Sequence, residues 1–130
     1  MPSPLRGLHE AVRPLADWAL GWARYYNVPV TVTSSYRSWQ SQADLRRRWE
    51  RAGRPASCIR TPTGLVCPAN RPGDSAHNYG LAWDSTTEPR YQAWWNHVRT
   101  LAGFSVPPHD EVHAEVPNWR SYVTVTRSPR

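Results

Sequence analysis

Apolar residues recur every three or four positions between residues 5 and 26, which is the period of a helix that buries one face. The positions are Leu5, Leu8, Val12, Leu15, Trp18, Ala19, Trp22 and Tyr26. The stripe predicts that Trp18 and Trp22 pack in the core. Pro14 lies inside the run, and it is expected to kink or split the helix because proline has no N–H to donate.

The rest of the chain alternates between strand-like and helix-like patterns. Residues 28–34 are mostly β-branched and predict a strand. Ser38 can cap a helix that runs to about Ala52, where Gly53 ends it. The remaining patterns predict a strand at 80–86, a helix at 88–102, a strand at 111–116 and a last short strand at 122–126. The helix predicted at 88–102 has one apolar side, formed by Tyr91, Trp94, Trp95, Val98 and Leu101.

Residues 53–73 show neither period and are rich in proline, glycine, serine and threonine. A loop of this length in a compact domain is unusual and often functional. It holds Cys58 and Cys67, for which a disulfide and two free thiols both remain open, and two cysteines do not fix the redox compartment. Helices beside a small antiparallel sheet predict the α+β class, with one domain over residues 1–130.

Charge adds a hint about partners. Arginine supplies all the basic residues, and the formal net charge is +6, which suits a polyanionic partner such as nucleic acid or an anionic cell-surface polymer. The arginines cluster only at Arg46, Arg47, Arg48, Arg51 and Arg54, a pattern more typical of a solvated helix than of a nucleic-acid site. No apolar run approaches the roughly 20 residues that cross a bilayer, and the first residues lack the apolar core of a secretory signal. We therefore expect no nucleic-acid binding and no membrane insertion.

Three short segments concentrate the reactive side chains: residues 34–38, 75–84 and 109–115. Zinc accepts imidazole nitrogen and carboxylate oxygen, and a catalytic zinc keeps three protein ligands. His77, Asp84 and His113 can supply such a set, and Gly80 permits a tight turn between the first two. The same residues could instead be structural, for example a histidine satisfied within a strand.

Two acidic residues could accept a proton near such a site. Strict strand alternation puts Glu111 on the same face as His113, whereas Asp110 needs an irregular start to the strand. Pro107 and Pro108 make that irregularity plausible. Periodicity alone leaves the two acids equal. The other histidines inside the predicted helices, His9 and His97, are interpreted as surface residues.

The motifs Ser-x-His-x-x-Gly-x-Ala-x-Asp over residues 75–84 and Asp-x-x-His over residues 110–113 resemble the zinc D-alanyl-D-alanine carboxypeptidase family. An early Ser-x-Tyr-Arg-Ser segment, at residues 34–38, is also similar to that family and comes in its order. The family shares its fold with the vancomycin-resistance dipeptidases, phage L-alanyl-D-glutamate endopeptidases and the Hedgehog signalling domain. The resemblance therefore implies a Hedgehog/DD-peptidase-like fold. Ala114, where many relatives have an aromatic residue, and the long loop depart from the pattern.

Carried over residue by residue, the resemblance implies that His77, Asp84 and His113 bind Zn²⁺. It implies that Asp110 rather than Glu111 is the general base. Further roles fall on the early segment and its neighbours: Arg37 would polarise or bind substrate near the scissile amide, and Ser75, Tyr36 and Gln42 would contribute to substrate binding. Glu115 could orient His113.

The implied reaction is metal-assisted hydrolysis of an amide bond in the peptidoglycan stem peptide, by a D-Ala-D-Ala carboxypeptidase or an L-Ala-D-Glu endopeptidase. We expect a monomer of the phage endolysin type that acts on the wall, in the periplasm or outside the cell. A lysin released through a holin and a virion-associated enzyme both fit this expectation. The alternative is a non-catalytic wall-binding or protein-binding module on the same zinc fold.

Overall fold

A computed structural model describes residues 4–123. Its helices and strands are α1 (Arg13–Tyr25), β1 (Val30–Ser34), α2 (Trp39–Arg51), β2 (Ile59–Thr61), β3 (Gly64–Val66), β4 (Ala82–Thr87), α3 (Gln92–Leu101) and β5 (His113–Glu115). Three short 3₁₀ helices complete it: η1 (Ala76–Tyr79), η2 (Pro89–Tyr91) and η3 (Trp119–Tyr122). The predicted α+β class is confirmed, and no helix of residues 4–123 has the length and apolar character to cross a membrane.

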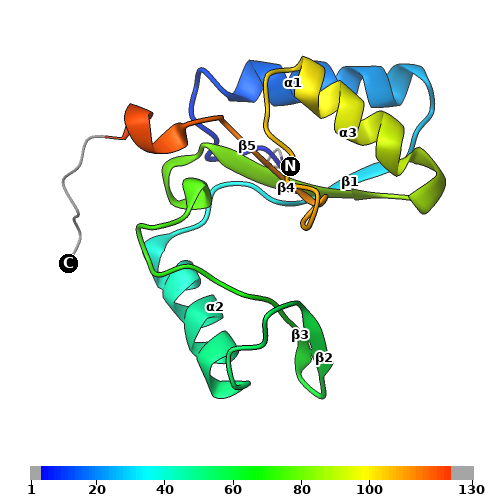
Figure 1. Ribbon diagram of the computed structural model, residues 1–130. Coiled ribbons are helices and arrows are strands. Elements are labelled where there is room, and N and C mark those ends of the chain that lie inside the picture. Colours follow the sequence, from blue (N-terminus) through cyan, green and yellow to red (C-terminus); the bar gives the residue numbers. More distant parts are fainter. Residues whose placement is uncertain (1–3, 124–130) are drawn as a thin grey trace.

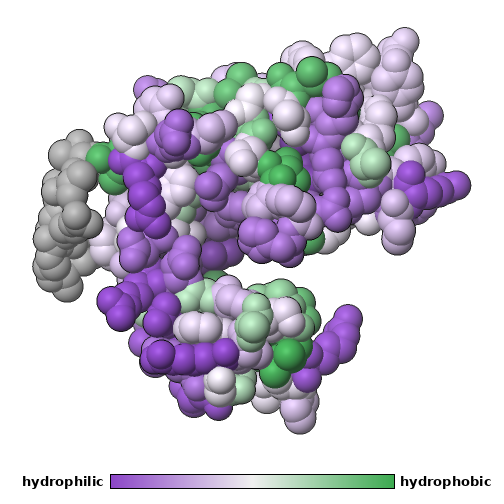
Figure 2. Space-filling model, viewed as in Figure 1, coloured by the Kyte–Doolittle hydropathy of each residue, from purple (hydrophilic) through white to green (hydrophobic). Residues whose placement is uncertain are grey.

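β4 is the central strand of a three-stranded antiparallel sheet with the order β1-β4-β5. The register places Asp84 opposite Ser34 on one side and opposite His113 on the other. Helices α1 and α3 lie together on one face of this sheet, and α2 with the β2–β3 hairpin stands off its other side (Figure 1). Figure 2 shows an open cleft between the sheet body and this second part.

The core lies between the sheet and the α1–α3 layer. Trp83 is fully buried there, and its ring centroid lies 5.9 Å from that of Trp95 and 5.6 Å from that of Phe104, both edge-on. Ser85 accepts a 2.8 Å hydrogen bond from the indole Nε1 of Trp95. Since successive strand residues face opposite ways, Asp84 points to the side of the cleft.

Helix α1 differs from its prediction at both its start and its buried face. It begins at Arg13, so Pro14 sits in the first turn, where its missing N–H is not needed, and there is no kink. The buried stripe is Ala16, Ala19 and Ala23.

The predicted burial of Trp18 and Trp22 is wrong, because Trp18 is 46% exposed and Trp22 39%. The core at this level is filled from the sheet and α3 by Trp83 and Trp95, and the alanines of α1 let the helix approach them.

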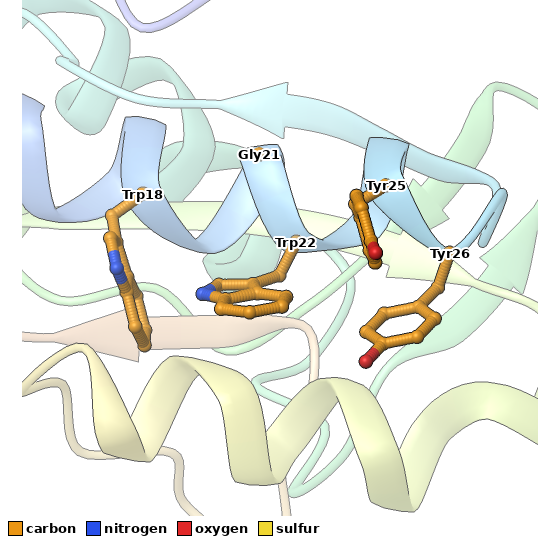
Figure 3. A pocket seen from close by; sticks show the side chains of 5 residues that line it. All are labelled: Trp18, Gly21, Trp22, Tyr25 and Tyr26. Carbon is orange, nitrogen blue, oxygen red and sulfur yellow. The ribbon is translucent and has the colours of Figure 1, made fainter.

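The large side chains of α1 form an exposed group, which we call the α1 aromatic cluster: Trp18, Trp22, Tyr25 and Tyr26. Figure 3 shows these rings spread along one side of the helix, where with Gly21 they line a shallow hollow of about 650 Å³. The rings contact one another, with Trp22 stacked on Tyr26 at a centroid distance of 5.9 Å. Helix α1 is therefore amphipathic as predicted, but its alanines face the core and its aromatic side chains face outward.

The segment after α2 is more ordered than its composition suggested. The Ser38 hydroxyl accepts a 3.0 Å bond from the Ser41 N–H, which confirms the predicted cap of α2. Residues 53–73 contain the β2–β3 hairpin instead of a structureless loop. A Cys58–Cys67 disulfide joins the outer ends of its two strands, so the question left open between a disulfide and free thiols is answered.

Two further predictions need correction near the C-terminus. On α3, Trp95 and Val98 are buried as expected, but Leu101 is 63% exposed and the charged Arg99 is fully buried. The strand predicted at 111–116 begins only at His113, after a turn. The strand predicted at 122–126 lies largely outside the described residues, and its first part ends η3.

Candidate metal centre

A tight turn carries His77 toward β4. The Ser75 hydroxyl accepts a hydrogen bond from the His77 N–H, which caps η1 at its start. Gly80 ends η1 with φ +71°, and a Cβ at this position would lie 2.6 Å from the backbone nitrogen of His9. A side chain is therefore excluded there, which confirms that this turn requires glycine.

His77, Asp84 and His113 converge on one point at the cleft side of the sheet. The Nε2 atom of His77 and the Nδ1 atom of His113 each lie 3.1 Å from Oδ1 of Asp84. One donor atom from each residue falls within 4.8 Å of the others. The centre is drawn from η1, β4 and β5, and the direct pairing of Asp84 with His113 across the sheet holds two of its three members.

The outward nitrogen of each ring is already in use. Nδ1 of His77 lies 2.7 Å from the carbonyl oxygen of Ser35, which can only accept, so this nitrogen carries the hydrogen. Nε2 of His113 lies 2.7 Å from a carboxylate oxygen of Glu115 and donates in the same way. In the neutral rings, the inward nitrogens are therefore bare.

Two bare imidazole nitrogens and one carboxylate then point lone pairs at the same space. Lone pairs so close repel unless a cation lies among them, either a proton on a ring or a metal ion. Two histidines and one carboxylate, each held from behind by a second group, are a donor set that Zn²⁺ accepts. The residues present therefore fit a zinc ion.

The pKa values of the centre respond to this crowding. Burial by itself raises the pKa of Asp84, but when His113 and His77 are protonated their hydrogen bonds to the carboxylate outweigh it and hold the pKa of that carboxyl well below its usual range. Burial lowers the pKa of His113, and its bonds to Asp84 and Glu115 more than reverse this, so the pKa is raised. Without a metal, a proton is thus favoured at the inward position of His113.

Arg37 lies beside the centre, where it was expected to bind substrate. One of its nitrogens is 3.7 Å from Oδ2 of Asp84 and 3.3 Å from the Ser34 hydroxyl, and the other donates to Gln42 Oε1 at 2.9 Å. Burial lowers the pKa of the guanidinium and Asp84 raises it in part. Arg37 therefore brings a partly buried positive charge next to the three donor atoms.

Of the other residues expected to bind substrate, two are placed behind the centre. Gln42 is 1% exposed, and its amide is shared between Arg37 and the Asn70 carbonyl, while its contact with substrate stays a prediction. Ser75 is 7% exposed and caps η1 through its hydroxyl, and its contact with substrate likewise stays a prediction. Tyr36 is 47% exposed and free to meet a ligand.

The two candidate bases are separated by the turn before β5. The Asp110 N–H donates to the Pro107 carbonyl and the Asp110 carbonyl accepts from the His113 N–H, so the strand does start irregularly after the prolines. The carboxylate of Glu111 accepts from the amide of Asn96 on α3, away from the centre, and the alternation argument for Glu111 is wrong. Asp110 is exposed. Within residues 4–123, its carboxylate takes no part in the hydrogen bonds that link His77, Asp84 and His113.

Known proteins resemble this chain in sequence and in fold. No family model matches it. The peptidoglycan L-alanyl-D-glutamate endopeptidase CwlK of Bacillus subtilis is 33% identical over 84 residues, which are 65% of this chain and 44% of CwlK. The chain thus spans under half the length of that relative.

Solved structures extend the likeness to nearly the whole chain. The L-Ala D-Glu endopeptidase ChiX of Serratia marcescens superposes with a TM-score of 0.58 at 23% identity, covering 92% of this chain and 86% of ChiX. The LD-carboxypeptidase LdcB gives 0.65 at 17%, covering 94% and 75%. A mutant of the vancomycin-resistance D,D-pentapeptidase VanY, in complex with Zn(II), gives 0.63 at 16%, covering 87% and 74%. The resemblance is therefore confirmed: this chain has the fold of peptidoglycan peptidases of the D-alanyl-D-alanine carboxypeptidase type.

Proposed function

We propose that this chain is a zinc-dependent peptidase that hydrolyses an amide bond in the stem peptide of peptidoglycan. The observation that carries the proposal is the meeting of two bare imidazole nitrogens with a carboxylate at the open cleft. The named relatives act on peptidoglycan or its peptides, and one of them holds Zn(II). An L-Ala-D-Glu endopeptidase is the version we favour, because CwlK and ChiX are the most identical of the named relatives.

In this proposal, His77 Nε2, an Asp84 oxygen and His113 Nδ1 hold the zinc ion. When bound, zinc supplies a Lewis acid that polarises a carbonyl and acidifies water. Ser35 and Glu115 keep the two imidazoles in the tautomers that leave the inward nitrogens bare.

Asp110 takes a proton from the attacking water and gives it to the nitrogen of the leaving amine. Arg37 places its positive charge where the carbonyl oxygen becomes negative, and Gln42 and Ser34 hold it in that position. Tyr36, exposed at the end of β1, is a further candidate for a direct substrate contact.

Digestion of purified sacculi tests the proposal. The wild-type protein should release stem-peptide fragments, and His77→Ala or Asp110→Ala should abolish the release. His97→Ala is the matched control, because His97 is an exposed histidine of α3 outside the centre. Removal of metal with a chelator should also stop release, and added zinc should restore it. Full activity of either site variant would overturn the assignment.

Mass spectrometry of the released muropeptides separates the versions of the proposal. Loss of one terminal D-alanine identifies a carboxypeptidase, and cleavage after L-alanine identifies the favoured endopeptidase. Binding to sacculi with no turnover in the presence of zinc would instead support the non-catalytic wall-binding module.

We also propose that residues 1–130 form one catalytic domain that works as a monomer at the cell wall, outside the cell or in the periplasm. The wall-acting relatives support the place of action. The phage endolysin version is tested by coexpression with a holin, which should cause lysis only when both proteins are made. A sedimentation mass equal to that of one chain at every protein concentration would agree with the monomer.

A further inference from the structure

Arg99 is a buried charge that the proposed reaction has not yet used. Its side chain comes from α3 and is 0% exposed, and its guanidinium lies over the Trp95 ring at 5.3 Å. Within residues 4–123, no carboxylate lies within ion-pair distance of it. A buried guanidinium without a close counter-ion is costly, so its hydrogen bonds must compensate for the lost water.

Two of its three hydrogen bonds go to carbonyls of the turn before β5, and the third goes to Asn96 of α3 itself. One guanidinium nitrogen donates to the Val112 carbonyl at 3.2 Å, and the other donates to the Glu111 carbonyl at 2.7 Å. The second nitrogen also donates to Asn96 Oδ1 at 2.7 Å, and the amide of Asn96 in turn holds the Glu111 carboxylate. The guanidinium of Arg99 therefore donates to two consecutive backbone carbonyls, those of Glu111 and Val112.

This turn carries both Asp110 and His113. Its own bonds run from the Asp110 N–H to Pro107 and from the His113 N–H back to the Asp110 carbonyl. The Val112 carbonyl that Arg99 holds also accepts from the Ser85 N–H of β4, at 3.0 Å. Movement at residues 111 and 112 would thus shift Asp110 relative to the metal centre. Besides Arg99, the body of the protein holds these two residues through bonds from Ser85, Asn96 and Gln92.

We propose that Arg99 is a positioning residue, a buried fork that fixes the turn at residues 110–113 and so sets Asp110 at its working distance from His113. This inference rests on the proposed function, since it assigns the place of the group that moves the proton. Lysine cannot replace the fork, because a single ammonium does not span two carbonyls and an amide oxygen in a fixed plane. Electrostatic attraction from Asp84, Asp110 and Glu111 adds to the hold on the guanidinium, whose pKa burial lowers only to about 10, so it stays charged.

The test compares Arg99→Lys and Arg99→Met with Val98→Ala, the neighbouring core residue of α3, which is 6% exposed. All are measured with saturating zinc, well below their unfolding temperatures, on a soluble stem peptide. In both Arg99 variants kcat should fall by about 100-fold, the effect expected of a misplacement of about 1 Å. KM and zinc affinity should stay near the wild-type values. Val98→Ala should lose stability but keep its kcat.

Amide hydrogen exchange gives a readout that does not depend on turnover. In Arg99→Lys the amides of Ser85 and His113 should exchange about tenfold faster than in the wild type, with other core amides unchanged. Val98→Ala should not single out these amides. If Arg99→Met does not fold, Arg99→Lys alone decides the outcome.

Three results would overturn the inference. Arg99→Lys with a wild-type kcat would show that the fork is not needed. A fall in zinc affinity as large as the fall in kcat would mean that Arg99 supports the metal centre instead of Asp110. Unchanged amide hydrogen exchange at residues 85 and 113 would mean that Arg99 does not fix the turn. A wild-type protein that binds zinc without turnover overturns the proposed function. In that case amide hydrogen exchange alone decides whether Arg99 fixes the turn.

Discussion

Trp83 and Asp84 are neighbours on β4, yet they belong to regions held together by different forces. Trp83 faces the α1–α3 layer, where buried aromatic rings and alanines pack against one another. Asp84 faces the cleft, where two imidazoles and Arg37 surround it. One side of the strand is packed with buried rings, and the other brings together three groups that could hold a cation.

The difference shows how a short strand can serve both stability and chemistry. The packed face fixes the plane and register of the sheet, and the register brings Asp84 opposite His113. Because the packed face supplies the rigidity, the cleft face can keep lone pairs in a crowded arrangement that is unfavourable without a proton or a metal ion. Variants on the two faces should therefore fail in different ways.

The largest effect is expected for Trp83→Ala on the packed face. Removing a fully buried indole from contact with Trp95 and Phe104 should lower the free energy of unfolding by about 3–5 kcal/mol. Urea unfolding of the metal-free protein measures the loss. If the variant stays folded, zinc should still raise its unfolding temperature. A loss below about 1 kcal/mol would mean that the two faces do not differ in packing.

Asp84→Ala should show the opposite behaviour on the cleft face. At a zinc concentration about 100 times the dissociation constant, the wild type should gain about 2.7 kcal/mol of stability, and the variant should gain almost none. Thermal unfolding with and without zinc measures the gain. His97→Ala, on the exposed side of α3, should gain as much as the wild type. Equal gains in Asp84→Ala and the wild type would place the metal elsewhere.

Much of this site could be predicted from the sequence, because its residues fall in short motifs at the ends of regular elements. His77, Gly80 and Asp84 lie within eight residues, and a glycine turn is the simplest way to aim a loop residue and a strand residue at one point. The α+β class followed from the order of the patterns. The side on which Glu111 lies did not, because alternation assumes a regular strand and the chain is still in a turn at Glu111.

Other features could not be predicted because they depend on contacts between distant segments. The stripe of α1 has two adjacent apolar halves, and only the presence of Trp83 and Trp95 decides that the alanines are buried and Trp18 is not. The sequence pattern gives no sign that Arg99 is buried, because its partners are the carbonyls of a turn 12 and 13 residues later. Likewise, the burial of Gln42 beside Arg37 depends on contacts that the sequence pattern of α2 does not show.

The pH dependence of zinc affinity sharpens the description of the cleft face. In the metal-free protein the pKa of His113 is raised by Asp84 and Glu115, so a proton competes with zinc for the inward nitrogen. Zinc affinity should therefore fall by up to about tenfold per pH unit once the pH drops below that pKa. Glu115→Gln removes one of the two charges that raise the pKa, so its curve should fall at a lower pH. Competition with a chelating dye at several pH values measures both curves, and coincident curves would contradict the role of Glu115.

The smallest effect is expected for Trp18→Ser in the α1 aromatic cluster. Trp18 is 46% exposed, and its main ring contact is edge-on with Trp22 at a centroid distance of 6.1 Å. Losing that pair should cost about 1 kcal/mol or less, measured by urea unfolding beside Trp83→Ala. Both variants remove an indole, and the helix-propensity cost of serine on α1, about 0.5 kcal/mol, is well below the difference expected from where each ring lies. If Trp18→Ser cost as much as Trp83→Ala, the apolar stripe of α1 would face the core as its period first suggested, and α1 would have to be rotated on the sheet.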